Sequence, residues 1–154
     1  MAKLKTTDLI AIAAVAFVLF YSPAVTPDVS PLPIPTPDAT TQAIVQPIGT
    51  VLAGHGAEAA ELAAFYHTAA DVVRRDGAGN KIISTTAQLR VFLERAVTLR
   101  FQGIFSKVPN LSEAIHGPSG ALSQLLGLEV AELDYVKTAA ALDAVAWACQ
   151  EASR

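Results

Sequence analysis

The pattern of hydrophobic and polar positions divides the chain into three parts. Residues 9–21 are apolar throughout, apart from the hydroxyl group of the final tyrosine. Residues 23–37 place prolines at positions 23, 27, 31, 33, 35 and 37. From residue 38 onward, apolar residues recur every three or four positions, which is the period of amphipathic α-helices. The pattern therefore predicts an apolar N-terminal segment (1–22), an extended linker (23–37) and a helical domain (38–154).

The N-terminal segment is predicted to be an uncleaved transmembrane signal anchor. A helix over residues 4–22 would be roughly 28 Å long, close to the ~30 Å hydrocarbon thickness of a bilayer. Lys3 and Lys5 precede the apolar run, and the next basic residue is Arg74, so the positive-inside rule places the N-terminus in the cytoplasm. The expected topology is single-pass type II, with lipid contacts through residues 4–22 and an extracytoplasmic domain, periplasmic or on the cell surface. A signal peptide cleaved near Ala24 and a buried core helix are the alternatives.

The proline-rich linker is predicted to be extended. Each proline removes an N–H donor and restricts its neighbour, which disfavours both helix and sheet interior. A polyproline II segment of this length reaches ~45 Å. It is interpreted as a spacer that holds the domain away from the membrane, and the alternative is a docking peptide for a proline-binding module.

The remaining chain predicts an all-α bundle of about four to six helices. The apolar spacing is clearest over residues 57–77, and the last predicted helix, from about residue 130 to residue 152, is apolar nearly all round, which is typical of a central helix. Thr85 and Gln88 have the spacing of a capping box. The expected helices cover residues 39–54, with a kink or a new start at Pro47, and then 57–77, 86–102, 111–117, 119–127 and 130–152, with a loop bounded by Gly103 and Pro109.

Composition disfavours some classes of protein and excludes some kinds of site. The net charge is −3, and charged residues make up 16% of the chain against about 25% in typical domains. No basic excess or stripe marks a nucleic-acid binder, so that class is disfavoured. Cys149 is the only cysteine, which excludes an intrachain disulfide and a CxxC motif. Its apolar neighbours predict a buried and unreactive thiol.

Histidines are the main candidates for metal binding or acid–base chemistry. His67 has Asp71 four residues on, where a carboxylate could orient the imidazole. His55 lies between two glycines, and His116 ends a predicted helix. The weak metal candidates are thus His55, His67 and Asp71. Structural or surface roles are favoured for all of them, and neither a catalytic set nor a cofactor is predicted.

A charged face is predicted on the helix that contains Arg90, Glu94, Arg95 and Arg100. Glu94 follows Arg90 by four residues, so pairing within the helix explains most of this charge. The alternative is an interaction face for a protein or an anionic envelope component.

These features favour a membrane-anchored, non-enzymatic helical domain that binds, scaffolds or assembles with an unknown protein partner in a cell envelope or virion, and homo-oligomerisation is compatible with them. One alternative is a tethered enzyme or a metal- or haem-binding domain that uses His67 and Asp71. Another is a small phage-type lysis or pore-forming protein, in which the uncharged residues 39–57 form a second membrane span.

Overall fold

A computed structural model of the chain describes residues 33–127 and 131–154. The regular secondary structure in these ranges is helical, apart from an isolated antiparallel bridge between Thr85 and Glu132. The predicted all-α fold is therefore confirmed. The predicted signal anchor and most of the proline-rich linker lie outside the described residues. Within the described ranges, no helix combines the length and the apolar character needed to cross a membrane, and this includes residues 39–57.

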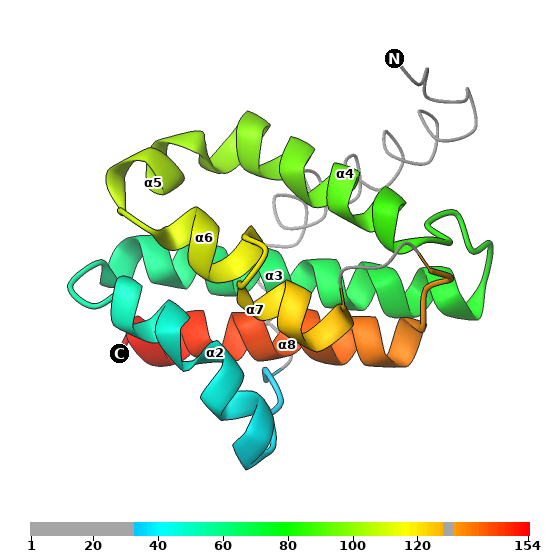
Figure 1. Cartoon of the computed structure of the whole chain (residues 1–154), viewed down its shortest axis with the longest axis horizontal. Coiled ribbons are helices and arrows are strands. Elements are labelled where there is room, and N and C mark those ends of the chain that lie inside the picture. Colours follow the sequence, from blue (N-terminus) through cyan, green and yellow to red (C-terminus); the bar gives the residue numbers. More distant parts are fainter. Residues whose placement is uncertain (1–32, 128–130) are drawn as a thin grey trace.

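Four helices longer than ten residues form the bulk of the described bundle, and three short helices close one side of it (Figure 1). The elements follow in the order α2 (Ala39–Val51), α3 (Gly56–Ala78), α4 (Thr86–Ala96), the π-helical segment η1 (Val97–Phe101), α5 (Gln102–Lys107), α6 (Leu111–His116), α7 (Ala121–Leu126) and α8 (Tyr135–Ala152).

Helices α3 and α8 lie side by side and form the centre of the bundle (Figure 1). They are antiparallel, because Gly56 at the start of α3 lies beside Ser153 and Gly77 at its end lies against Tyr135. A Cβ atom on Gly77 would lie only 2.4 Å from Cγ of Tyr135, so a glycine is needed for this close approach. Helix α8 buries residues on nearly all sides, which confirms the prediction that the last helix is central.

Helix α2 crosses the C-terminal half of α8 (Figure 1). The side chain of Asp38 caps it by accepting a hydrogen bond from the Thr41 N–H at 2.7 Å. Pro47 lies inside this helix, which is continuous from Ala39 to Val51. The predicted new start at Pro47 is therefore wrong. Val45 and Ile48 are buried, whereas the rest of the helix is partly or fully exposed.

Helix α4 begins with the predicted capping box, in which the Thr85 hydroxyl accepts from the Gln88 N–H and the Gln88 side chain accepts from the Thr85 N–H. The helical path then widens into η1 and continues through α5, which includes Gly103. The loop predicted to begin at Gly103 is therefore helical as far as Lys107. No Cβ-sized obstacle lies within 4 Å of Gly103, and this exposed glycine is accommodated without a break.

Candidate functional site

His67 lies in the middle of α3 and is buried between helices. Its Nδ1 atom is 2.7 Å from Oδ1 of Asp143, which lies on α8 and is 2% exposed. The expected pairing with Asp71 is wrong, because the antiparallel α8 brings a buried carboxylate directly opposite the ring. Asp71 instead accepts a hydrogen bond from Nη1 of Arg74 at 2.9 Å.

Arg74 completes a polar cluster between α3 and α8. Its Nη2 atom donates to Oδ2 of Asp143, while its Nη1 atom donates to Asp71. The bond to Asp143 raises the pKa of Arg74 above its ordinary value. Asp143 therefore accepts from a guanidinium on one oxygen and faces an imidazole nitrogen with the other. These contacts compensate for burying a carboxylate in an apolar interface.

The His67 ring is oriented as in many metal and general-base sites. When a carboxylate accepts from Nδ1–H, the neutral ring carries its free electron pair on Nε2. Here Nε2 is buried and has no hydrogen-bond partner among residues 33–127 and 131–154. The described ranges contain no group of three or more histidine, cysteine, aspartate or glutamate side chains that could hold a metal ion. The cluster thus has the orientation of a reactive histidine but no accessible nitrogen.

His116 forms a second buried contact. Its Nε2 atom is 2.6 Å from the hydroxyl oxygen of Tyr66. Burial lowers the pKa of His116 to about 4, and burial also raises the pKa of Tyr66. The imidazole is therefore neutral near pH 7. It borders a small, partly open pocket of about 60 Å³, together with Arg90 and Glu94, which holds no more than a few water molecules.

The remaining sequence candidates lie apart from these clusters. His55 occupies the N-cap position of α3 and makes no side-chain cap hydrogen bond. Cys149 is fully buried, and burial raises the pKa of its thiol to about 12. The prediction of a buried thiol is confirmed. Among the residues that the structure describes, the three histidines do not converge on one ligand set.

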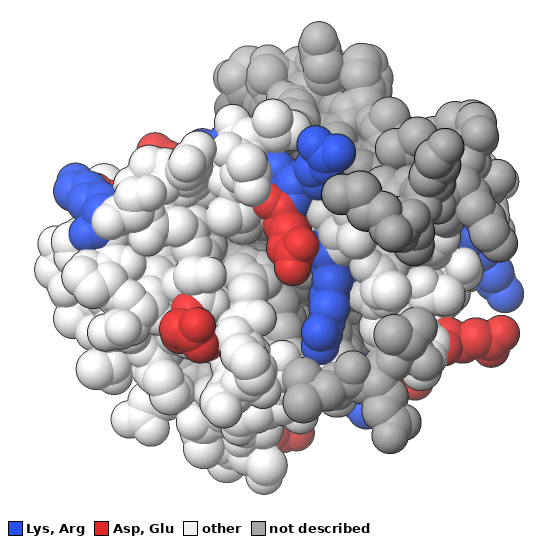
Figure 2. All heavy atoms as spheres, turned by 45° about the horizontal axis from the view of Figure 1, so that its top comes forward, with Lys and Arg blue, Asp and Glu red and all other residues white. Residues whose placement is uncertain are grey.

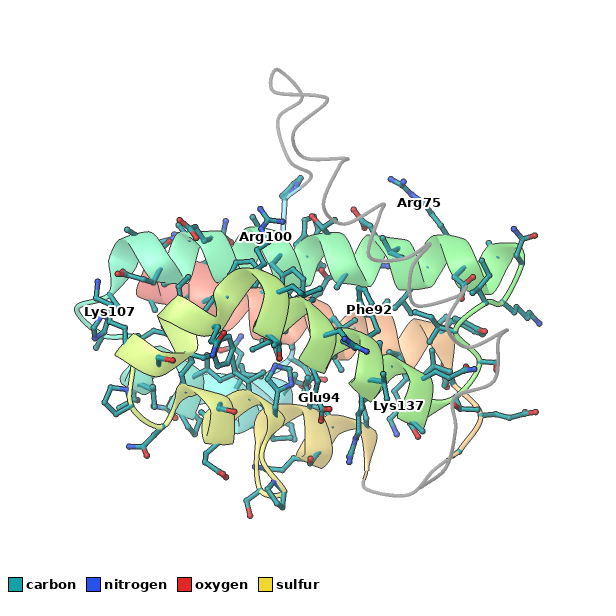
Figure 3. All side chains as sticks on the ribbon, turned by 90° about the horizontal axis from the view of Figure 1, so that it is seen from above. Arg75, Phe92, Glu94, Arg100, Lys107 and Lys137 are labelled. Carbon is teal, nitrogen blue, oxygen red and sulfur yellow. The ribbon has the colours of Figure 1, made fainter. Side chains whose placement is uncertain are left out.

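The predicted charged face on α4 and η1 is not continuous. Arg90 donates to the Gly127 carbonyl at 3.3 Å, and no ion pair within the described ranges joins it to Glu94. Figure 3 shows Glu94 and Arg100 on opposite sides of the helical path. The guanidinium of Arg100 lies 5.2 Å from the Phe101 ring centroid. On the face drawn in Figure 2, the described acidic and basic side chains are interspersed. A role for these residues in binding stays a prediction.

The crossing of α2 over α8 leaves an open groove on each flank of α2. On one flank is a groove of about 490 Å³, here called the tryptophan groove. On the other is a groove of about 380 Å³, here called the proline groove. The tryptophan groove is lined by Gln42, Ala43 and Gln46 of α2 and by Trp147, Ala148 and Glu151 of α8. The proline groove is lined by Pro35, Thr36 and Pro37 and by Ala140, Ala141 and Ala144 of α8.

Trp147 is the only tryptophan of the chain, and it is partly buried against the core. The apolar pattern of the last helix placed Trp147 in the core but did not indicate that part of its ring borders a groove. Asp143 was missed as well, although a lone carboxylate within the apolar sequence AALDAVAW signals a buried charge that needs a partner. Comparison of the chain with family models, curated proteins and solved structures found no match.

Proposed function

We propose that the chain is a membrane-anchored, non-enzymatic docking protein. In this proposal residues 1–22 are the signal anchor, residues 23–37 are the stalk, and residues 38–154 are a helical domain outside the cytoplasmic membrane. The domain binds or assembles with a protein partner in a cell envelope or virion. The anchor and the stalk are supported by the apolar run behind Lys3 and Lys5 and by the six prolines that follow it.

The tryptophan groove is the observation that carries the docking role. It combines a partly exposed aromatic ring with small side chains, Ala43 and Ala148, that let a partner approach closely. Tryptophan is strongly enriched among the residues that dominate binding energy at protein interfaces. Amide groups of Gln42 and Gln46 border the same groove and supply polar contacts at its edge. An aromatic floor with a polar rim is the usual composition of an interface.

The second candidate function is metal or haem binding through His67. It is favoured by the bond from Asp143 to Nδ1 and by the unpartnered Nε2 atom. The enclosure of Nε2 opposes it, because a ligand would first have to separate α3 from its neighbours. Elemental analysis and an absorption spectrum of the purified full chain distinguish the two functions, since a stoichiometric metal or haem would favour this second one.

Site-specific photo-crosslinking tests the docking role. A photoreactive amino acid replaces Gln46 at the tryptophan groove in the membrane-inserted full chain. The matched control replaces Gln102, an exposed glutamine on α5. We expect a discrete protein adduct from position 46 that is several times more abundant than any adduct from position 102. Equal or absent adducts at the two positions would contradict the docking role.

A further inference from the structure

Residues 34–37, the last four of the proline-rich segment, lie against the helical domain. The side chain of Ile34 is partly buried and packs on the hydrophobic core. Residues 35–37 line the proline groove together with three alanines of α8. The segment that joins the predicted stalk to the domain is therefore placed on the domain by contacts of its own, in addition to its covalent link to α2.

Hydrogen bonds fix the end of this segment to the first turn of α2. The side-chain amide of Gln42 donates to the Pro37 carbonyl at 2.8 Å, and the backbone N–H of Gln42 donates to the Asp38 carbonyl at 2.8 Å. The Thr41 N–H donates to the Asp38 carboxylate at 2.7 Å. Gln42 thus binds two consecutive carbonyls at the point where the proline-rich segment enters the helix.

The backbone of the same segment has little conformational freedom. Proline fixes its own φ angle near about −65° and disfavours the helical region for the residue before it. In residues 32–37 every position is either a proline or the residue before a proline. Ordering such a segment costs less conformational entropy than ordering an ordinary one, so the contacts of Ile34 and Pro37 are sufficient to hold it.

The junction also lacks the residues that would let the domain turn freely. Flexible linkers between domains are rich in glycine and serine. Residues 31–38 contain neither, and the last of them is the N-cap of α2. A change in the direction of the stalk at this point therefore requires that the contacts of residues 34–37 be broken.

We infer that residues 34–37 form a rigid joint that fixes the orientation of the helical domain relative to its stalk. The joint is held at two points, by Ile34 on the core and by Gln42 on the Pro37 carbonyl. Its consequence for docking rests on the function proposed above. A domain on a rigid joint presents its surface in one direction, which raises the effective concentration of that surface for a partner placed there and lowers it elsewhere.

Distances between spin labels test the joint in the full chain in detergent micelles. One label is attached through Ser30→Cys in the stalk and the other through Ala60→Cys, an exposed position on α3. The native Cys149 can stay in place because it is fully buried and burial raises the pKa of its thiol to about 12. We expect a single narrow distribution of distances, similar in width to that of a reference pair within the domain, Ala60→Cys and Gln102→Cys.

Variants of the joint should broaden this distribution. Replacing Ile34 by serine and Gln42 by alanine in one chain removes both points of contact, and the width should at least double. The matched control is Gln46→Ala, which removes an exposed amide one turn further along α2 and should leave the width unchanged. A Gly-Ser-Gly insertion between Pro37 and Asp38 leaves the cap of α2 intact and should broaden the distribution as well. The reference pair shows that the domain stays folded in each variant.

Each outcome bears on the joint separately from the docking role. A wild-type distribution as broad as that of the insertion variant would overturn the rigid joint. A double variant as narrow as the wild type would overturn it too, because the two contacts would not hold the segment. A broad wild-type distribution with a photo-adduct at position 46 removes the joint and leaves the docking role. A narrow distribution without that adduct leaves the joint and removes the docking role.

Discussion

Helix α8 meets α3 along its length and α2 at a crossing, and the two contacts differ in kind. The α3–α8 contact is closed: Gly77 admits Tyr135 at close range, and Asp143 is held by both His67 and Arg74. The α2–α8 contact leaves open grooves on both flanks, one of which exposes part of Trp147. The closed contact positions the helices and buries His67 and Asp143, while Arg74 reaches Asp143 from the exposed side of α3. The open contact leaves surface for a partner.

The largest effect is expected from removing the cation of the closed contact. Arg74→Met would leave the carboxylate of Asp143, whose side chain is 3% exposed, with only His67 as a partner. Breaking a fully buried ion pair on one side costs about 3–5 kcal/mol. The Arg74 side chain is 44% exposed and partly screened by water, so a loss of about 2–3 kcal/mol is expected. The matched control is Arg75→Met at the next position, where the side chain points away from the bundle (Figure 3) and the change should be below about 0.5 kcal/mol. Denaturant unfolding followed by circular dichroism measures both, and equal losses would show that the cluster does not hold α3 and α8 together.

A smaller effect is expected from adding one methyl group at each contact. Gly77→Ala places a Cβ atom 2.4 Å from the Tyr135 ring, and overpacking of this kind costs about 1–3 kcal/mol. Gly49→Ala in α2 places a Cβ atom 3.9 Å from the Ala148 carbonyl oxygen. This is an ordinary contact distance. The gain in helix propensity should therefore stabilise the folded chain by up to about 1 kcal/mol. Thermal unfolding of the two variants measures both changes in stability. A destabilising Gly49→Ala would mean that the α2–α8 contact is as tightly packed as the α3–α8 contact.

A change of pH separates the effect on folding from the effect on docking. The folded-state pKa of His116 is lowered to about 4 from 6.5 by burial, so the unfolded chain binds more protons between these two values. The stability contributed by this neutral histidine is therefore present above pH 6.5 and is lost as the pH falls toward 4. The expected loss between pH 7 and pH 5 is about 2 kcal/mol.

His116→Gln should reduce this pH dependence, because glutamine does not titrate. The free energy of unfolding at pH 7 and pH 5 in both forms gives the comparison. His116 does not line either groove of the α2–α8 contact, so docking by the folded chain should be unchanged at pH 5. An unchanged pH dependence in His116→Gln would assign the loss of stability to other groups.

Local sequence signals predicted much of the fold. The capping box at Thr85 and Gln88 and the apolar period of α3 depend on residues within one or two turns of each other, and both are found. Pro47 lies inside a continuous helix because the helix is stabilised on both sides of it. The capped first turn of α2 precedes Pro47, and the buried side chain of Ile48 follows it. The continuation through Gly103 was missed because glycine weakens a helix by only about 1 kcal/mol.

The His67–Asp143 cluster and the tryptophan groove depend on long-range contacts and could not be predicted. His67 and Asp143 are 76 residues apart, and only the antiparallel packing of α3 on α8 brings them together. The groove at Trp147 exists because α2 crosses α8 at an angle, and no periodic pattern encodes that angle. Burial of Cys149 was predictable because Val145, Ala146 and Ala152, one turn away on either side, are apolar.

The most direct test of the docking role is to block the tryptophan groove without touching the core. Ala43 is exposed and lines this groove, so Ala43→Arg should fill it and change the free energy of unfolding by less than about 0.5 kcal/mol. The yield of the photo-adduct at position 46 should then fall to the level of the Gln102 control. An unchanged adduct yield in a fully folded Ala43→Arg chain would contradict the assignment of the groove as the docking site.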